Sequence, residues 1–119
     1  MFPRLEERRR NRGSQLSGGE QQMLTTARTI LGRPSVLLLD EPLEGLAPVI
    51  CDELMAALTS LAAKGDMTIV LVEQRIRAAL DFAERVLILE RGRVAWSGTR
   101  DELRAAPETL EELLGVGGR

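Results

Sequence analysis

Two short runs of residues in this sequence have the composition of a nucleotide-binding site. The first is Leu16–Gln22, in which Ser17 is followed by two glycines, and the second is Val36–Pro42, an apolar run that leads into Asp40 and Glu41. Backbone N–H groups and a hydroxyl at the start of a helix bind anions such as phosphate. Carboxylates at the end of a strand hold Mg²⁺ or polarise water. Together the two runs predict phosphate and magnesium chemistry.

The run that begins at Ser17 also has a purely structural interpretation. Ser17 and Glu20 match the S-x-x-E capping box, which by itself would explain the start of a helix. However, Gly18 and Gly19 are a costly choice in a first turn, because each loses more backbone entropy than alanine would. We therefore expect a ligand to approach the backbone closely at these glycines.

The phosphate-binding loop that usually accompanies such carboxylates has the pattern G-x-x-x-x-G-K-[ST]. This sequence contains a single lysine, Lys64, which lies between Ala63 and Gly65. The pattern is therefore absent from the 119 residues, and we expect them to hold only part of a nucleotide site.

Length and composition narrow the classes of function. The chain has 119 residues, a net charge of −2, no histidine and one cysteine, which suits at most one soluble domain without an internal disulfide. The arginines between Arg4 and Arg12 are not interleaved with aromatic residues, so we expect a solvated helix face and no nucleic-acid partner. Cys51 has no histidine to activate it and fits a small residue that is half-buried on a helix.

The order of the predicted elements indicates an α/β fold with a parallel sheet. The continuously apolar run Val36–Leu39 predicts a parallel strand covered on both faces. Arg91 and Gly92 predict a tight hairpin, and Thr99 with Glu102 matches a capping box. Hydrophobic periodicity predicts helices over 2–12, 17–31, 48–64, 75–84 and from 100 onward with a break near 107, and strands over 36–39, 67–72, 85–90 and 93–97.

The run Leu16–Gln22 resembles the signature motif of ATP-binding cassette (ABC) ATPases, and Val36–Pro42 resembles their Walker B strand. The resemblance extends from about Phe2 to the C-terminus. It implies that residues 1–119 are a partial domain, the C-terminal part of a P-loop NTPase, with a parallel sheet and flanking helices but without the half that carries the Walker A loop.

The resemblance also implies a role for individual side chains around ATP and Mg²⁺. Asp40 would hold the metal, usually through water, and Glu41 would be the general base. Gln74 takes the place of the switch histidine; it can donate a hydrogen bond but cannot carry a proton, which leaves the general-base role to Glu41. The residues expected to contact the nucleotide are Ser17, Gly18, Gly19 and Gln21.

Two further segments indicate which group of ABC ATPases the sequence resembles. Glu44–Pro48, with Ala47 where the family usually has aspartate, and Leu71–Gln74 resemble the ATPase subunits of branched-chain amino-acid importers. Urea and short-chain amide importers are a close alternative. The family implies a second ABC ATPase subunit and transmembrane permease subunits as partners, and a cytoplasmic location at the inner membrane. In this family two ATPase subunits enclose ATP between them. The signature motif at Leu16–Gln22 would therefore complete the site whose phosphate-binding loop lies on the partner subunit.

Three interpretations of the 119 residues remain open. The first is the C-terminal portion of an importer ATPase that functions only with the missing part or a complete partner. The second is a truncated remnant or interaction module without turnover. A DNA-repair ABC ATPase is a weaker third, because no heptad coiled coil is present. In each case we expect no ATP binding by the isolated chain, and self-association through an exposed sheet edge.

Overall fold

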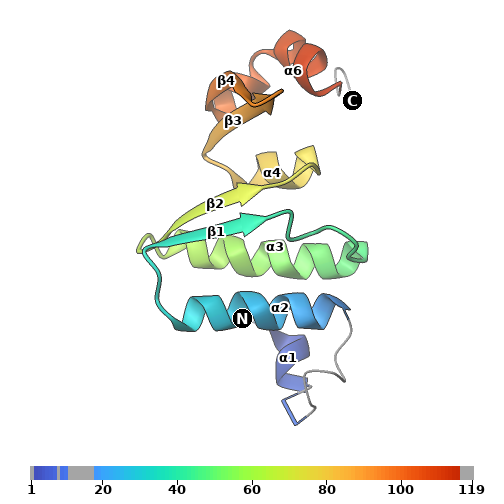
Figure 1. The fold of residues 1–119 in the computed structure, drawn as a ribbon, viewed down its shortest axis with the longest axis vertical. Coiled ribbons are helices and arrows are strands. Elements are labelled where there is room, and N and C mark those ends of the chain that lie inside the picture. The colour runs from blue at the N-terminus through green and yellow to red at the C-terminus, as the bar shows by residue number, and fades with distance from the viewer. Residues whose placement is uncertain (1, 8, 11–17, 116–119) are drawn as a thin grey trace. The chain divides into compact units, whose positions relative to one another are not determined.

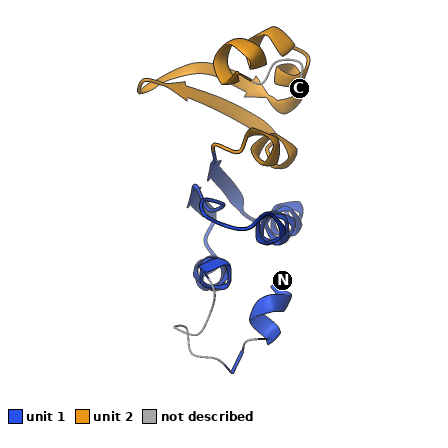
Figure 2. Cartoon of the chain, turned by 90° about the vertical axis from the view of Figure 1, so that its right-hand side faces the viewer, with its two compact units in different colours: residues 1–73 blue, residues 74–119 orange. Residues whose placement is uncertain are grey.

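The computed structural model describes residues 2–7, 9–10 and 18–115 (Figure 1). These residues form two compact units, 1–73 and 74–119, which are described separately (Figure 2). The helices of the first unit are α1 (Pro3–Glu7), α2 (Gly18–Leu31) and α3 (Pro48–Ala63), and its strands are β1 (Val36–Asp40) and β2 (Thr68–Val72). The second unit contains α4 (Ile76–Phe82), β3 (Arg85–Glu90), β4 (Arg93–Thr99), α5 (Arg100–Arg104) and α6 (Pro107–Leu114).

The first unit is built on a parallel pair of strands joined through α3. The register runs from Val36 opposite Thr68 to Asp40 opposite Val72. Figure 1 shows α2 and α3 both running along the direction of the two strands. Pro48 occupies the first turn of α3, where its missing N–H costs nothing. The result is the strand–helix–strand unit that the sequence predicts.

The core of this unit lies between the sheet and its helices. Outside this core, a salt bridge of 2.7 Å between Arg4 Nε and Glu53 Oε2 links α1 to α3. The side chains that are fully buried in the core come from β1, from the loop after it, and from α2 and α3: Met23, Leu37, Leu43, Leu54 and Leu58. Burial of one stripe on α2 and on α3 explains why the periodicity predicted these two helices correctly.

The two strands bury one face against described residues and expose the other. Leu37 is 1% exposed, whereas Val36 and Leu38 on the opposite face are 51% and 72% exposed. Val70 and Val72, which the register places on that same face, are 45% and 52% exposed. The prediction that this strand is covered on both faces is therefore wrong for the described residues. The apolar side chains are present on both faces, but the described helices pack against only one.

The second unit begins with α4 and continues with an antiparallel hairpin. Arg91 and Gly92 have φ values of 50° and 76°, the left-handed conformation of a two-residue type I′ turn. The register shifts between Ile88 and Leu89, where β4 carries an extra residue. The predicted hairpin is confirmed.

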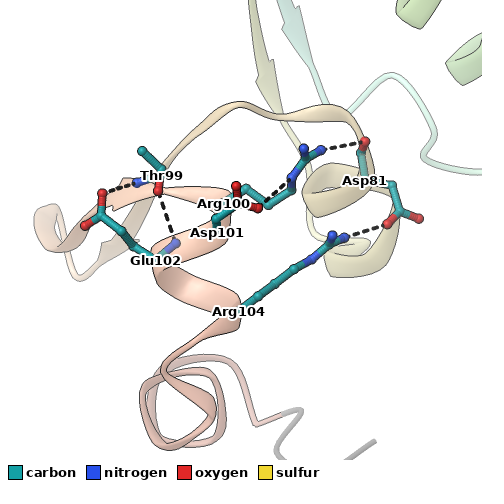
Figure 3. A network of polar contacts seen from close by, with 6 residues as sticks. All are labelled: Asp81, Thr99, Arg100, Asp101, Glu102 and Arg104. Atoms are coloured by element: carbon teal, nitrogen blue, oxygen red, sulfur yellow. Dashed lines mark hydrogen bonds and ion pairs between the residues drawn. The ribbon is translucent and has the colours of Figure 1, made fainter.

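A polar network holds the start of α5 and connects it to α4 (Figure 3). The Glu102 backbone N–H donates to Thr99 Oγ1 at 3.1 Å, and the Thr99 N–H donates to Glu102 Oε1 at 3.4 Å. This confirms the predicted capping box. Arg100 Nη1 donates to the Asp81 carbonyl at 3.2 Å, and Arg104 Nη2 lies 2.9 Å from Asp81 Oδ1. Both arginines thus bind the last turn of α4.

Most element boundaries agree with the sequence predictions to within a few residues. The first helix was expected over 2–12 and is described as Pro3–Glu7, followed by a turn at Arg9 and Arg10; residues 11 and 12 lie outside the described residues. Its sequence is rich in arginine and offers few apolar positions with which to extend a packed face. Within the described residues, no helix combines the length and apolarity that crossing a bilayer requires.

Candidate functional site

The predicted magnesium ligand and the predicted general base lie together at one edge of the parallel sheet. Asp40 is exposed at the last position of β1, opposite Val72, and the half-buried Glu41 follows it. The Glu41 N–H donates to the Val72 carbonyl at 2.7 Å, which holds Glu41 against the end of β2. Glu73 comes directly after β2, so carboxylates from both strands meet at the same edge.

The backbone of Glu41 adopts a conformation that residues other than glycine normally avoid. Its φ is 47°, in the left-handed region, where Cβ crowds the following carbonyl. The turn is fixed on its far side by Leu43, which is fully buried, and by a 3.2 Å hydrogen bond from the Glu44 N–H to the Glu41 carbonyl. Strained residues persist where their surroundings fix them, and they concentrate at functional sites. The conformation of Glu41 therefore points to a functional position.

The surroundings of Glu41 raise the pKa of its carboxyl group. The largest cause is partial burial, which disfavours the charged form. The charge and hydrogen bonding of Glu44 raise the pKa further, followed by the charges of Asp40 and Glu73. A carboxylate with a raised pKa is a stronger base, which suits removal of a proton from water. The sequence analysis assigned no electrostatic role to Glu44 or Glu73; only their positions next to the ends of β1 and β2 hinted at one.

The two glycines at the start of α2 have different surroundings. At Gly18 an added Cβ would meet no atom within 4 Å, so the backbone there is accessible. At Gly19 an added Cβ would lie 2.6 Å from Cγ2 of Ile50. Close packing on α3 therefore explains Gly19, whereas open space at Gly18 fits the predicted approach of a ligand. Ser17 lies outside the described residues, so its predicted capping and phosphate-binding roles stay predictions.

Gln21 and Gln74 are both exposed. Gln21 is in the first turns of α2, where its carbonyl accepts a 3.0 Å hydrogen bond from Thr25 Oγ1. Gln74 lies in a bend two residues after β2 and begins the second unit. The structure thus places Asp40 and Glu41 together, whereas the expected roles of Gln21 and Gln74 stay predictions.

The donor set at the sheet edge suits a magnesium ion that is bound jointly with phosphate. Among the described residues, no group of three or more histidine, cysteine, aspartate or glutamate side chains is placed to hold a metal ion. Mg²⁺ keeps several waters and is commonly bound by one or two carboxylates plus substrate phosphates. The exposed carboxylate of Asp40 satisfies that requirement for the protein's share of the ligands.

The loop after Glu41 is attached to the start of α3. The N–H groups of Ile50 and Cys51 both donate to the Ala47 carbonyl at 3.0 Å. Cys51 Sγ lies 3.8 Å and 3.7 Å from the carbonyl oxygens of Leu43 and Leu46. Cys51 is buried, more fully than the half burial expected from the sequence. These contacts fix the loop that positions Glu41.

Comparison with known proteins agrees with the motifs. The family model described as "ABC transporter" matches residues 2–44, which include both glycines and both carboxylates. The branched-chain amino acid transport ATP-binding protein BraG of Pseudomonas aeruginosa is 42% identical over 115 residues, which are 97% of this chain and 49% of BraG. This chain belongs to the ABC transporter ATPase family. It spans about half the length of the curated relatives that it matches.

Solved structures of ABC ATPases have the same fold. The ATP-binding cassette MJ1267 matches with a TM-score of 0.81 at 22% identity, over 96% of this chain and 45% of MJ1267. A dimeric ATP-binding cassette, MJ0796, bound to ADP and Pi, matches with a TM-score of 0.65 at 32% identity, over 73% of this chain and 37% of MJ0796. The α/β fold class is therefore that of an ABC ATPase cassette.

Proposed function

We propose that this chain is part of the ATP-hydrolysing subunit of an ABC importer for branched-chain amino acids. The observation that carries the proposal is the placement of Asp40 and Glu41 at the carboxyl edge of the parallel strands, with a strained backbone at Glu41. The solute is inferred from the identity to BraG and from the segments Glu44–Pro48 and Leu71–Gln74.

Each predicted residue has a part in this function. Gly18 and Gly19 at the start of α2 face the terminal phosphate of an ATP molecule, and Gln21 contributes to the same surface. Ser17, which precedes them in the sequence, has its predicted place beside the same phosphate. With a phosphate-binding loop present beside them, Glu41 would accept a proton from the attacking water, and Gln74 would donate a hydrogen bond toward the phosphate. In the same arrangement Asp40 would hold Mg²⁺, and the ion would neutralise charge on the phosphates.

The sequence of 119 residues supplies only part of a complete site. Without a G-x-x-x-x-G-K-[ST] loop, these residues lack the backbone cradle and the lysine that bind the phosphates. We therefore propose that the chain by itself does not bind ATP. The start of α2 instead acts on ATP held by a second ABC ATPase subunit, in an assembly with transmembrane permease subunits at the cytoplasmic side of the membrane.

A mixing experiment tests whether the start of α2 completes the ATP site of a second subunit, that is, whether this chain acts as a half-site. The partner is a full-length branched-chain importer ATPase with an intact phosphate-binding loop, whose own signature serine is replaced by arginine to abolish its hydrolysis. Adding the 119-residue chain should restore ATP hydrolysis, and the Ser17→Arg variant should not. Thr25→Arg, an exposed change further along α2, serves as the matched control and should still restore hydrolysis.

Two results would contradict the proposal. If the wild-type chain restores no hydrolysis, it does not act as a half-site, and the alternative of an interaction module without turnover is favoured. If the chain alone binds magnesium and ATP saturably at micromolar concentrations, the inference drawn from the absent loop is wrong.

A further inference from the structure

Ile50 of α3 occupies the space next to Gly19 at the start of α2. We infer that Ile50 is a positioning residue, which sets the place of the phosphate-facing first turn of α2 relative to the loop that begins at Glu41. The mechanistic meaning of this contact rests on the function proposed above. The contact itself is a property of the folded chain and can be tested without nucleotide.

The steric basis is the absence of a Cβ at position 19. A Cβ built there would lie 2.6 Å from Cγ2, 3.3 Å from Cγ1 and 3.4 Å from Cβ of Ile50. A separation of 2.6 Å is shorter than carbon atoms tolerate, and a β-branched side chain in a helix has one strongly preferred rotamer with which to respond. Only glycine at position 19 permits this approach. One residue earlier, Gly18 has no atom near its missing Cβ.

Ile50 is itself attached to the loop after Glu41. It is the third residue of α3, and its N–H donates to the Ala47 carbonyl at 3.0 Å. The next residue, Cys51, is buried and contacts the carbonyl oxygens of Leu43 and Leu46. Leu43 in the loop and Leu54 one turn further along α3 are fully buried, which anchors both segments in the core. A side chain at position 19 would therefore push on Ile50, and through Ile50 on the start of α3 and the loop attached to it.

The consequence is a direct mechanical connection between the start of α2 and the loop that begins at Glu41. The first turn of α2 faces phosphate, and the loop holds the general base Glu41. Contact through Gly19 and Ile50 makes the position of one depend on the position of the other. Gly18 and Gly19 thus have separate roles, the first in access to the backbone and the second in packing.

A double-mutant cycle on the full 119-residue chain tests the inference. Gly19→Ala should lower the folding equilibrium constant by about tenfold or more, as overpacking does, and should raise amide hydrogen exchange across residues 41–47. Ile50→Ala removes both γ carbons and should restore exchange in the Gly19→Ala background. Ile50→Val keeps both γ carbons and should not. Gly18→Ala is the matched control and should leave exchange across 41–47 unchanged.

The outcomes separate the inference from the proposed function. Additive effects of Gly19→Ala and Ile50→Ala, or a change in exchange confined to the first turn of α2, would overturn the positioning role. If Gly19→Ala does not fold, recovery of folding by Ile50→Ala but not by Ile50→Val supports the role, and recovery by neither overturns it. In the mixing assay, Gly19→Ala should reduce kcat about tenfold and Ile50→Ala should restore it. Failure of the wild-type chain in that assay refutes the function and leaves the exchange result valid.

Discussion

Replacing Leu37 or Leu38 by alanine compares the two faces of the sheet at adjacent positions. Leu37 is 1% exposed, so truncation leaves a cavity, and losses of about 2–5 kcal/mol are typical of such sites. Leu38 is 72% exposed, so only about a quarter of its surface is buried. Since full burial of leucine stabilises by about 1.5–3 kcal/mol, Leu38→Ala should cost less than about 1 kcal/mol.

The assay is urea unfolding followed by far-ultraviolet circular dichroism at several protein concentrations. The unfolding midpoint of Leu37→Ala should fall sharply at every concentration, whereas that of Leu38→Ala should stay close to wild type at low concentration. At high concentration the exposed face is expected to promote self-association, which makes the apparent stability rise with concentration. Leu38→Lys should remove that concentration dependence, because it places a charge in the middle of the apolar face.

One result would refute this reasoning. If Leu38→Ala costs as much as Leu37→Ala at the lowest measurable concentration, the outer face is covered within the folded chain. The difference between the two neighbours would then not follow from burial. A cost for Leu38→Ala that grows with protein concentration would instead show that a second copy covers the face.

Three further outcomes are expected. Because folding raises the pKa of Glu41, the folded state holds a proton that the unfolded chain releases, so wild-type stability should fall as pH rises from the ordinary carboxyl range through the raised pKa. Glu41→Gln should abolish that part of the pH dependence in urea titrations between pH 4 and 8, and an unchanged dependence would contradict it. Thr99→Ala removes the cap of α5 and should lower the unfolding free energy by about 1 kcal/mol, whereas equal stability would argue against the cap. Arg91→Asn relieves a φ of 50° in the hairpin turn and should raise the thermal midpoint, with a gain of about 1 kcal/mol; a lower midpoint would contradict the turn assignment.

Local signals in the sequence were sufficient to predict most of the helices, strands and turns. The capping box at Thr99, the turn at Arg91 and Gly92, and the proline at the start of α3 each act over a few residues, so their effects can be predicted without knowing the fold. The apolar run of β1 indicated a parallel strand correctly. It did not indicate which face is covered, since that depends on where helices pack.

The candidate site likewise has some features that the sequence predicted and others that only the fold decided. The residue types and spacing of Gly18, Gly19, Asp40 and Glu41 predicted phosphate and magnesium chemistry, because each of these chemistries needs particular donor groups in a particular order. The tertiary structure alone separated the two glycines, since the space available to a Cβ at position 19 is set by Ile50, which is distant in sequence. It also decided the environment of Glu41, because a pKa depends on the burial and charges that the ends of two strands place around one carboxyl group.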